Sequence, residues 1–277
     1  MASEKSVQQG VRGWIQSVRP VPMWLMILAV VLYLAMSWFA NQVSTPSSWF
    51  PGLPTASGHV ITPTFLNYVP MFIIMGLLLV LVGRLRCNDL GLIRQRFLSG
   101  LAWVICTWVV VQLFVVLFQQ GAVSIDPSWD DLVVKKISLL VTGQLLANAL
   151  YEELFWRAFL ISQLVLLMTR VMKLRMGTAL AWAIIISSVL FALSHIPNDL
   201  LYGRAIPQGQ FDRLLAGIIF GSLFLLSNNI FLVIGLHGLV NKPLFLFQDS
   251  GGEKDLIFFV PLVVLAILAI RRRLAAR

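Results

Sequence analysis

Residues 97–118 of this chain read FLSGLAWVICTWVVVQLFVVLF, an apolar run that contains no charged side chain. A helix needs about 20 such residues to cross the hydrocarbon core of a membrane. Similar apolar stretches occur at residues 21–40, 66–83, 137–164, 177–196, 212–227, 230–247 and 255–270. The sequence therefore predicts an all-α, polytopic membrane protein in which eight transmembrane helices form a single membrane domain, residues 1–277.

The composition of the chain also indicates a membrane protein. Of the 277 residues, 58% are hydrophobic and 12% are charged, and the mean hydropathy is +0.86. Soluble domains carry about 25% charged residues, so the soluble class is excluded. The net charge of +9 would suit a nucleic-acid partner, but the basic residues cluster at the ends of the apolar runs. We therefore expect membrane lipid, and no nucleic acid, as a partner.

The distribution of lysine and arginine predicts the orientation, because cytoplasmic loops carry an excess of both. With the N-terminus inside, the cytoplasmic segments hold Lys5, Arg12, Arg19, Arg84, Arg86, Arg94, Arg96, Arg170, Lys173, Arg175, Arg271, Arg272, Arg273 and Arg277. The outer segments then hold only Lys135, Lys136, Arg204, Arg213, Lys242 and Lys254. We expect a bacterial inner membrane, with both termini in the cytoplasm.

Two adjacent glutamates interrupt the fourth apolar stretch, in the sequence Glu152-Glu153-Leu154-Phe155-Trp156-Arg157. Charged groups are costly in hydrocarbon, so they are rare in spans and are functional by default. On a helix, Glu153 and Arg157 are i,i+4 neighbours that can pair, whereas Glu152 points about 100° away. Glu152 would then be free to act as a general base. The alternative is that all three charges form an ion network that joins helices.

Two histidines lie in equally apolar surroundings. His195 ends the fifth stretch, and we expect its side chain to diverge from that of Ser194 on the helix. His237 and Asn241 are i,i+4 neighbours on one helical face, and two donors on one face suit the stabilisation of an oxyanion. The alternative is that each histidine makes a structural hydrogen bond between helices. Together with the glutamates, these residues predict a polar cavity enclosed by the membrane helices.

Other common catalytic patterns are absent from the sequence. There is no His-Glu-x-x-His zinc motif and no Gly-x-Ser-x-Gly nucleophile motif. Cys106 lies inside an apolar run, where we expect a small buried hydrophobe. Glu152, Glu153, His195 and His237 are acceptable zinc ligands, but their spacing is not diagnostic of a metal. We therefore expect no cofactor and no metal, with zinc kept as a minor alternative.

The three motifs occur in the order Glu-Glu-x-x-x-Arg, Phe-x-x-x-His and His-x-x-x-Asn, within a predicted catalytic core at residues 135–245. This ordered set resembles the CAAX protease and bacteriocin-processing family of intramembrane proteases. The family includes prenyl-protein endopeptidases of the Ras-converting-enzyme type and the abortive-infection proteins. The resemblance implies that Glu152 and His195 activate water, and that His237 and Asn241 hold the oxyanion. It also implies that Glu153 and Arg157 position the first motif and that Phe191 packs near the site.

The resemblance implies a glutamic-type intramembrane endopeptidase whose substrate is a membrane-associated protein or peptide, with a prenylated CAAX-type protein as one option. Two other functions stay open: a non-catalytic bacteriocin-immunity or peptide-binding protein of the same fold, and a proton-coupled transporter. One tension concerns His195, which the predicted orientation places toward the outer end of its helix. A substrate delivered from the cytosol would need a deep cavity, an offset helix or a different number of spans.

Overall fold

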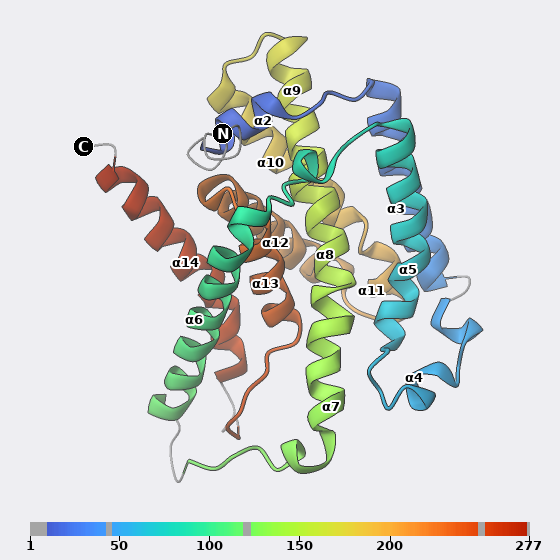
Figure 1. The fold of residues 1–277 in the computed structure, drawn as a ribbon, viewed down its shortest axis with the longest axis vertical. Coiled ribbons are helices and arrows are strands. Elements are labelled where there is room, and N and C mark those ends of the chain that lie inside the picture. The colour runs from blue at the N-terminus through green and yellow to red at the C-terminus, as the bar shows by residue number, and fades with distance from the viewer. Residues whose placement is uncertain (1–9, 43–45, 119–122, 249–252, 276–277) are drawn as a thin grey trace.

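The structure is a computed structural model that describes residues 10–42, 46–118, 123–248 and 253–275 (Figure 1). These residues form helices joined by turns, and a single antiparallel bridge pairs Ile125 with Phe247. The prediction of an all-α protein is confirmed. The elements in chain order are α2 (Val11–Ser17), α3 (Met23–Gln42), η1 (Pro46–Trp49), α4 (Leu53–Ala56), α5 (Pro63–Gly76), η2 (Leu77–Val82), η3 (Cys87–Leu90), α6 (Arg94–Phe118), α7 (Ser128–Leu140), η4 (Val141–Leu145), α8 (Asn148–Glu153), η5 (Leu154–Ile161), α9 (Ser162–Arg170), α10 (Met176–Leu193), α11 (Ile196–Leu201), α12 (Ile206–Ser227), α13 (Ile230–Asn241) and α14 (Glu253–Ala275).

The helices are long and apolar enough for a polytopic membrane protein. Within the described residues, six helical segments could cross a membrane: Met23–Gln42, Pro63–Val82, Cys87–Leu117, Leu132–Arg170, Met176–Leu201 and Ile206–Ser227. The last two expected spans correspond to shorter apolar helices, Ile230–Asn241 and Val260–Arg271. The polytopic class is confirmed, and the number of eight spans stays a prediction.

The fourth expected span is not one regular helix. Between residues 128 and 170 the chain passes through α7, the π-helix η4, α8, the π-helix η5 and α9. Ala147 has φ −129° and ψ −97°, so α8 begins as a new helix at Asn148. Thr142 in η4 donates a hydrogen bond to the Ser138 carbonyl at 2.8 Å, a back-bond that bends helices. Both glutamates therefore lie on a short helix between two π segments, a feature common at functional sites.

Glycines allow the helices around α8 to approach one another closely. A Cβ atom on Gly217 of α12 would lie 2.8 Å from the Cβ of Ser188 in α10, so only glycine fits there. On α13, a Cβ atom on Gly238 would lie 2.7 Å from Leu145 of η4. Helix α13 packs against α8, which carries both glutamates, while α10 and α12 pack against η5, which follows it. Figure 1 shows α8 near the middle of the bundle.

The turn between α12 and α13 makes the two helices an antiparallel hairpin. Asn228 ends α12 in the left-handed conformation, with φ 53°. The Asn229 side chain caps α13 by accepting from the Phe231 amide at 3.1 Å, and it donates to the Arg96 carbonyl of α6 at 2.9 Å. The hairpin is therefore attached to α6 at the turn.

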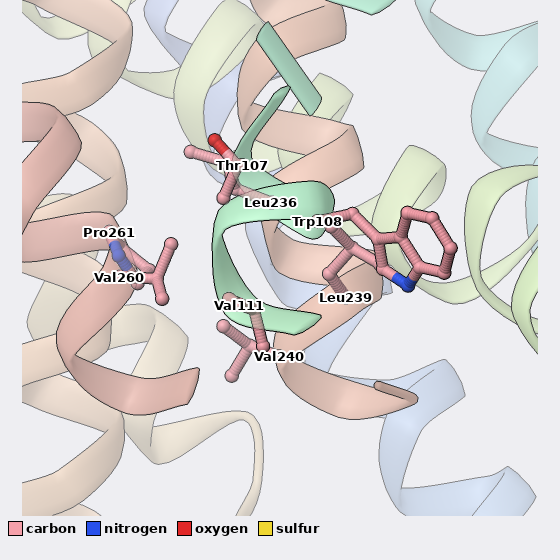
Figure 2. Close-up of a pocket in the computed structure, with 8 residues that line it drawn as sticks. All are labelled: Thr107, Trp108, Val111, Leu236, Leu239, Val240, Val260 and Pro261. Atoms are coloured by element: carbon pink, nitrogen blue, oxygen red, sulfur yellow. The ribbon is translucent and has the colours of Figure 1, made fainter. Parts of the chain in front are cut away.

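The segment after α13 is held by side chains of α6. Trp108 Nε1 and Gln112 Nε2 both donate to the Leu244 carbonyl, at 2.9 and 3.1 Å. Below them, α6, α13 and α14 enclose an apolar cavity of about 10 Å³, shown in Figure 2 with its lining residues Thr107, Trp108, Val111, Leu236, Leu239, Val240, Val260 and Pro261. Leu236, Leu239 and Val240 line this cavity, so α13 lies against α6 and α14 up to the residue before Asn241.

One expectation about the cysteines is wrong, because Cys106 is exposed and not buried. It lies on α6, which is apolar on all sides and turns side chains such as Leu113 and Phe114 outward. In a membrane this surface faces lipid, so an apolar sequence context does not predict burial in protein. Cys87, between α5 and α6, is exposed as well.

Candidate active site

A cavity of about 1030 Å³, lined by polar and apolar side chains, lies inside the bundle between α3, α5, α8, α11, α12, α13 and α14. The four residues expected to be catalytic, Glu152, His195, His237 and Asn241, all line it. Phe191 lines it too, whereas Glu153 and Arg157 are buried behind it, with exposures of 0% and 1%. The helix packing thus brings the three sequence motifs to one place.

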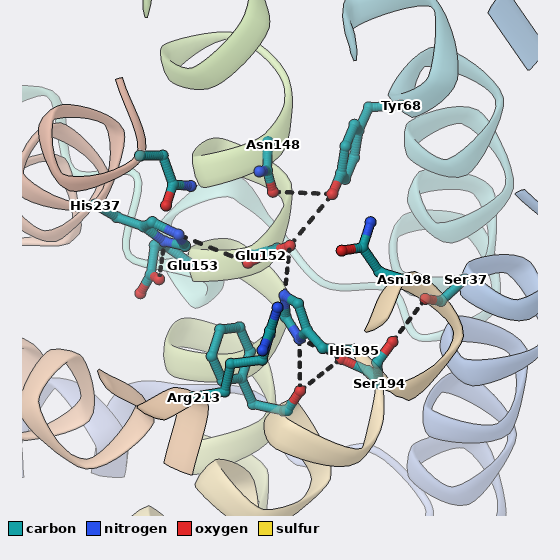
Figure 3. Close-up of polar contacts among 12 residues, drawn as sticks. Ser37, Tyr68, Asn148, Glu152, Glu153, Ser194, His195, Asn198, Arg213 and His237 are labelled. Carbon is teal, nitrogen blue, oxygen red and sulfur yellow. Dashed lines mark hydrogen bonds and ion pairs between the residues drawn. The ribbon is translucent and has the colours of Figure 1, made fainter. Parts of the chain in front are cut away.

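Glu152 lies between the two histidines (Figure 3). Its Oε1 is 3.7 Å from His195 Nε2, and its Oε2 is 3.8 Å from His237 Nε2. These separations are too long for direct hydrogen bonds and suit a water that bridges the two groups. The carboxylate is 3% exposed, so it meets only what enters the cavity.

The hydrogen bond of His195 Nδ1 determines the tautomer of the ring. It therefore determines whether the nitrogen on the Glu152 side, Nε2, can accept a hydrogen bond. Nδ1 lies 2.8 Å from the Phe191 carbonyl oxygen. Because a carbonyl only accepts, Nδ1 carries the proton, and in the neutral ring Nε2 presents a lone pair on the Glu152 side. The ring also packs edge-on against Phe191, at a centroid distance of 4.6 Å.

Ser194 does not diverge from His195 as expected. Its Oγ lies 3.3 Å from His195 Nδ1 and donates to the Phe191 carbonyl at 2.7 Å. The α-helix ends at Leu193, so both side chains fold back onto the last turn instead of pointing to different faces. The hydroxyl hydrogen is donated to a carbonyl and the residue is 3% exposed, so Ser194 is not an activated nucleophile.

Glu153 connects two of the motifs. Its Oε2 lies 3.1 Å from Arg157 Nε, the i,i+4 ion pair that the spacing predicts. Its Oε1 lies 2.7 Å from His237 Nδ1, a contact between residues 84 positions apart in the chain. A carboxylate at Nδ1 orients the ring and leaves Nε2 directed at Glu152.

The arginine of the first motif lies against aromatic rings. The Arg157 guanidinium is 4.4 Å from the ring centroid of Phe191 and 5.8 Å from that of Phe220, distances typical of cation–π contacts. Phe220 in turn stacks on the His237 ring, at 5.0 Å and an interplanar angle of 17°. Phe220 therefore supports the site, although no sequence motif contains it.

Asn241 lies at the exposed end of α13. It donates from Nδ2 to Gln144 Oε1 at 2.9 Å. An amide NH2 group has two hydrogens, so the second remains for a ligand in the cavity. His237 and Asn241 both reach the cavity, but Asn241 is oriented by Gln144 on another element.

Three polar residues of the site were missed by the sequence reasoning. The Tyr68 hydroxyl of α5 lies 2.8 Å from Asn148 Oδ1 and 3.2 Å from Glu152 Oε1. Gln144, Asn148 and Glu152 recur every four residues, a spacing that could have identified the first two. No sequence spacing links Tyr68 to Glu152, because the two lie on different helices.

An ion pair anchors the helix that follows His195. Asp199 of α11 is 0% exposed, and its Oδ1 lies 2.8 Å from Arg213 NH2 of α12. Gln210 donates to the other carboxylate oxygen at 3.1 Å. Figure 3 shows Arg213 beside His195. Of the two carboxylates that line the cavity, Glu152 and Asp212, Glu152 faces both histidines and Asp212 accepts a hydrogen bond from Gln208.

The side chains of the cavity include possible metal ligands. Glu152, His195 and His237 are ligand types that zinc accepts. Among the described residues, however, no group of three or more histidine, cysteine, aspartate or glutamate side chains is close enough to hold one. No chemical step is therefore assigned to a metal, and metal independence stays a prediction.

Comparison with protein families gives one match. Residues 135–242 match the family described as type II CAAX prenyl endopeptidase Rce1-like. The matched range begins within α7, ends directly after α13 and contains all three motifs. Comparisons with curated proteins and with solved structures gave no match. The family resemblance predicted from the three motifs is confirmed.

Proposed function

Residues 135–242 carry an Rce1-like domain, and from this premise we propose that the protein is an intramembrane endopeptidase that uses water activated by Glu152. The observation that supports this function best is the position of Glu152, whose two carboxylate oxygens each face the Nε2 atom of a histidine. A general base must lie within reach of the proton it abstracts, directly or through one water.

In the first step, a water bound between Glu152 Oε1 and His195 Nε2 attacks the scissile carbonyl carbon. The two atoms are 3.7 Å apart, so one water can hydrogen-bond to both. Glu152 takes one proton of this water, and the water oxygen forms the new bond to carbon. General-base assistance of this kind contributes about 10²–10⁴ in rate.

In the second step, the carbonyl oxygen becomes an oxyanion that His237 and Asn241 stabilise. The contact of His237 Nδ1 with Glu153 holds the ring so that Nε2, when it carries a proton, can donate to the oxyanion. Asn241 offers the amide hydrogen that Gln144 does not use. The buried Glu153–Arg157 pair holds His237 in this orientation and is a positioning element.

In the third step, the tetrahedral intermediate collapses. The carbon–nitrogen bond breaks, and the proton held by Glu152 passes to the leaving amine. The products are a peptide with a new carboxyl terminus and a peptide with a new amino terminus. Tyr68 keeps Glu152 oriented through both proton transfers.

The cavity wall suits a membrane-associated substrate. Beside its polar groups it includes apolar side chains of α12 and α14, among them Leu215, Ile219 and Leu262. The substrate is accordingly a membrane-associated protein or peptide, with prenylated CAAX-type proteins as the class named by the family. The location that goes with this function is a bacterial inner membrane, with both termini in the cytoplasm.

A peptide-cleavage assay tests the proposal. Purified protein is incubated with a farnesylated CAAX peptide and with a peptide library, and the products are identified by mass spectrometry. We expect cleavage by the wild type and loss of cleavage in Glu152→Gln, which keeps the side-chain shape and removes the base. Asp212→Asn is the matched control, because Asp212 lines the same cavity and hydrogen-bonds to Gln208 instead of a histidine. Normal cleavage by Glu152→Gln would contradict the mechanism and favour a peptide-binding protein.

A further inference from the structure

The lining of the cavity includes polar residues that reach the surface at one end of the helix bundle. We call these residues the mouth: Tyr202, Arg204, Gln208 and Lys242 are exposed, and Asn41 and Asn67 are half-buried. They lie at the last turn of α3, the first turns of α5, the connection from α11 to α12, the first turn of α12 and the residue after α13. Because neighbouring helices run in opposite directions, these helix starts and helix ends lie at the same end of the bundle.

The basic segments of the chain gather at the opposite end. Arg19, just before α3, donates to the Arg84 carbonyl, and Arg170, at the end of α9, donates to the Gln16 carbonyl at 3.3 Å. Arg96, at the start of α6, donates to the Asn228 carbonyl in the turn between α12 and α13. These bonds join four separate segments into one basic end.

The mouth and the basic end lie at opposite ends of the same helices. Helix α3 starts after Arg19 and ends at Asn41 and Gln42, about 30 Å away for its 20 residues. Helix α13 starts after Asn228 and ends beside Lys242. In Figure 1 the basic end is uppermost, with α2, α9 and the C-terminal part of α14, while α4 lies at the lower end.

Arginine and lysine are distributed unequally between the two ends. In the described part of the chain, the basic end carries Arg12, Arg19, Arg84, Arg86, Arg94, Arg96, Arg170, Lys173, Arg175 and Arg271. The mouth end carries Lys135, Lys136, Arg204, Arg213 and Lys242. Three of the latter hold aspartates: Lys136 pairs with Asp126 at 2.9 Å, while Arg213 and Arg204 pair with Asp199 at 2.8 and 3.9 Å. Since lysine and arginine accumulate on cytoplasmic loops, the basic end is the cytoplasmic one.

We infer that the cavity opens to the extracytoplasmic face, and that its substrates are polypeptides whose scissile segment reaches it from that face. The part of this inference that concerns substrates rests on the proposed function. The direction in which the cavity opens does not depend on catalysis. It explains why His195 lies at the outer end of its helix. A lipidated peptide that is a substrate would have to reach the site from the same face.

Cysteine labelling in intact cells tests the direction of opening. Cys106→Ala leaves Cys87 as a single reporter at the basic end, where it is exposed between Arg86 and Asn88. A second variant carries its single reporter at the mouth, where Tyr202 is 65% exposed. It combines Tyr202→Cys with Cys87→Ala and Cys106→Ala. A membrane-impermeant maleimide should label the Tyr202→Cys protein in intact cells and label Cys87 only after permeabilisation. Labelling in detergent gives the total amount of cysteine that can react in each variant. If the Tyr202→Cys protein does not fold, Gln208→Cys takes its place.

The opposite labelling pattern, or equal labelling from both sides, would overturn the inference. Cleavage is measured separately with an added peptide, in sealed vesicles of either orientation. We expect right-side-out vesicles to cleave it and inverted vesicles to do so only after detergent. Expected labelling without cleavage would contradict the proposed function and leave the direction of opening intact. Cleavage confined to inverted vesicles would keep the function and refute the direction.

Discussion

His237 Nδ1 lies 2.7 Å from Glu153 Oε1, so the second glutamate of the pair holds a histidine from a helix 84 residues further along the chain. The first glutamate, Glu152, faces the cavity and the Nε2 atoms of both histidines. Two identical neighbouring side chains therefore have different environments. One is buried in an ion network, and the other is open to a ligand.

The buried pair of Glu153 and Arg157 should behave as a unit in stability. Glu153→Gln or Arg157→Met alone leaves an uncompensated buried charge, which costs about 3–5 kcal/mol, whereas removing both can be close to neutral. Chemical denaturation of the four proteins of this double-mutant cycle measures the coupling. Activity should stay low in the double variant, because His237 has lost its carboxylate. The control is Lys136→Met, which breaks a partly exposed pair worth about 0–1 kcal/mol. Additive losses of stability would show that the buried pair is not coupled.

Tyr68→Phe should lower kcat about 10–100-fold with little change in KM, because a hydrogen bond to a charged group is worth about 1.5–3 kcal/mol. The Tyr68 hydroxyl lies 3.2 Å from Glu152 and orients the proposed base. Steady-state kinetics on a cleaved peptide measures both constants. Tyr202→Phe is the matched control, since Tyr202 lines the same cavity away from Glu152. A similar kcat in both variants would remove Tyr68 from the mechanism.

Asn241→Ala should lower kcat by about 10²–10³ while KM changes little, by analogy with the loss of one oxyanion-hole donor. An oxyanion exists only during the reaction, so its donors act mainly on the transition state. Asn67→Ala is the control, because it removes an amide of the same cavity whose oxygen accepts from the Ser47 amide. A raised KM at unchanged kcat would instead make Asn241 a contact for the bound substrate.

Peptide cleavage should survive treatment with EDTA and phenanthroline, and active protein should contain no stoichiometric zinc. The physical reason is that the proposed nucleophile is activated by a carboxylate and an imidazole, and no step needs a Lewis acid. Elemental analysis of the purified, active enzyme measures the metal content. About one zinc per chain, lost together with activity and restored by added zinc, would refute the glutamic-type mechanism.

Local patterns in the sequence determined the class of fold and part of the site. Apolar runs of span length predicted an all-α membrane protein, because burial of backbone groups in lipid requires helices. The i,i+4 spacing predicted the pair of Glu153 with Arg157, since side chains four residues apart share one face of a helix. The ordered motifs predicted the family match at residues 135–242. The same four-residue spacing links Glu152 to Asn148 and Gln144.

Contacts between helices were decided only by the tertiary structure. The approach of Glu153 to His237 and of Tyr68 to Glu152 depends on how closely α5, α8 and α13 pack, and spacing along one helix carries no information about a neighbouring helix. The exposure of Cys106 followed from which side of α6 meets the bundle. The inferred direction of the cavity rests on both sources. The charges along the chain favour one end of the bundle as cytoplasmic, and the packing of the helices brings the exposed polar residues of the cavity lining to the other end.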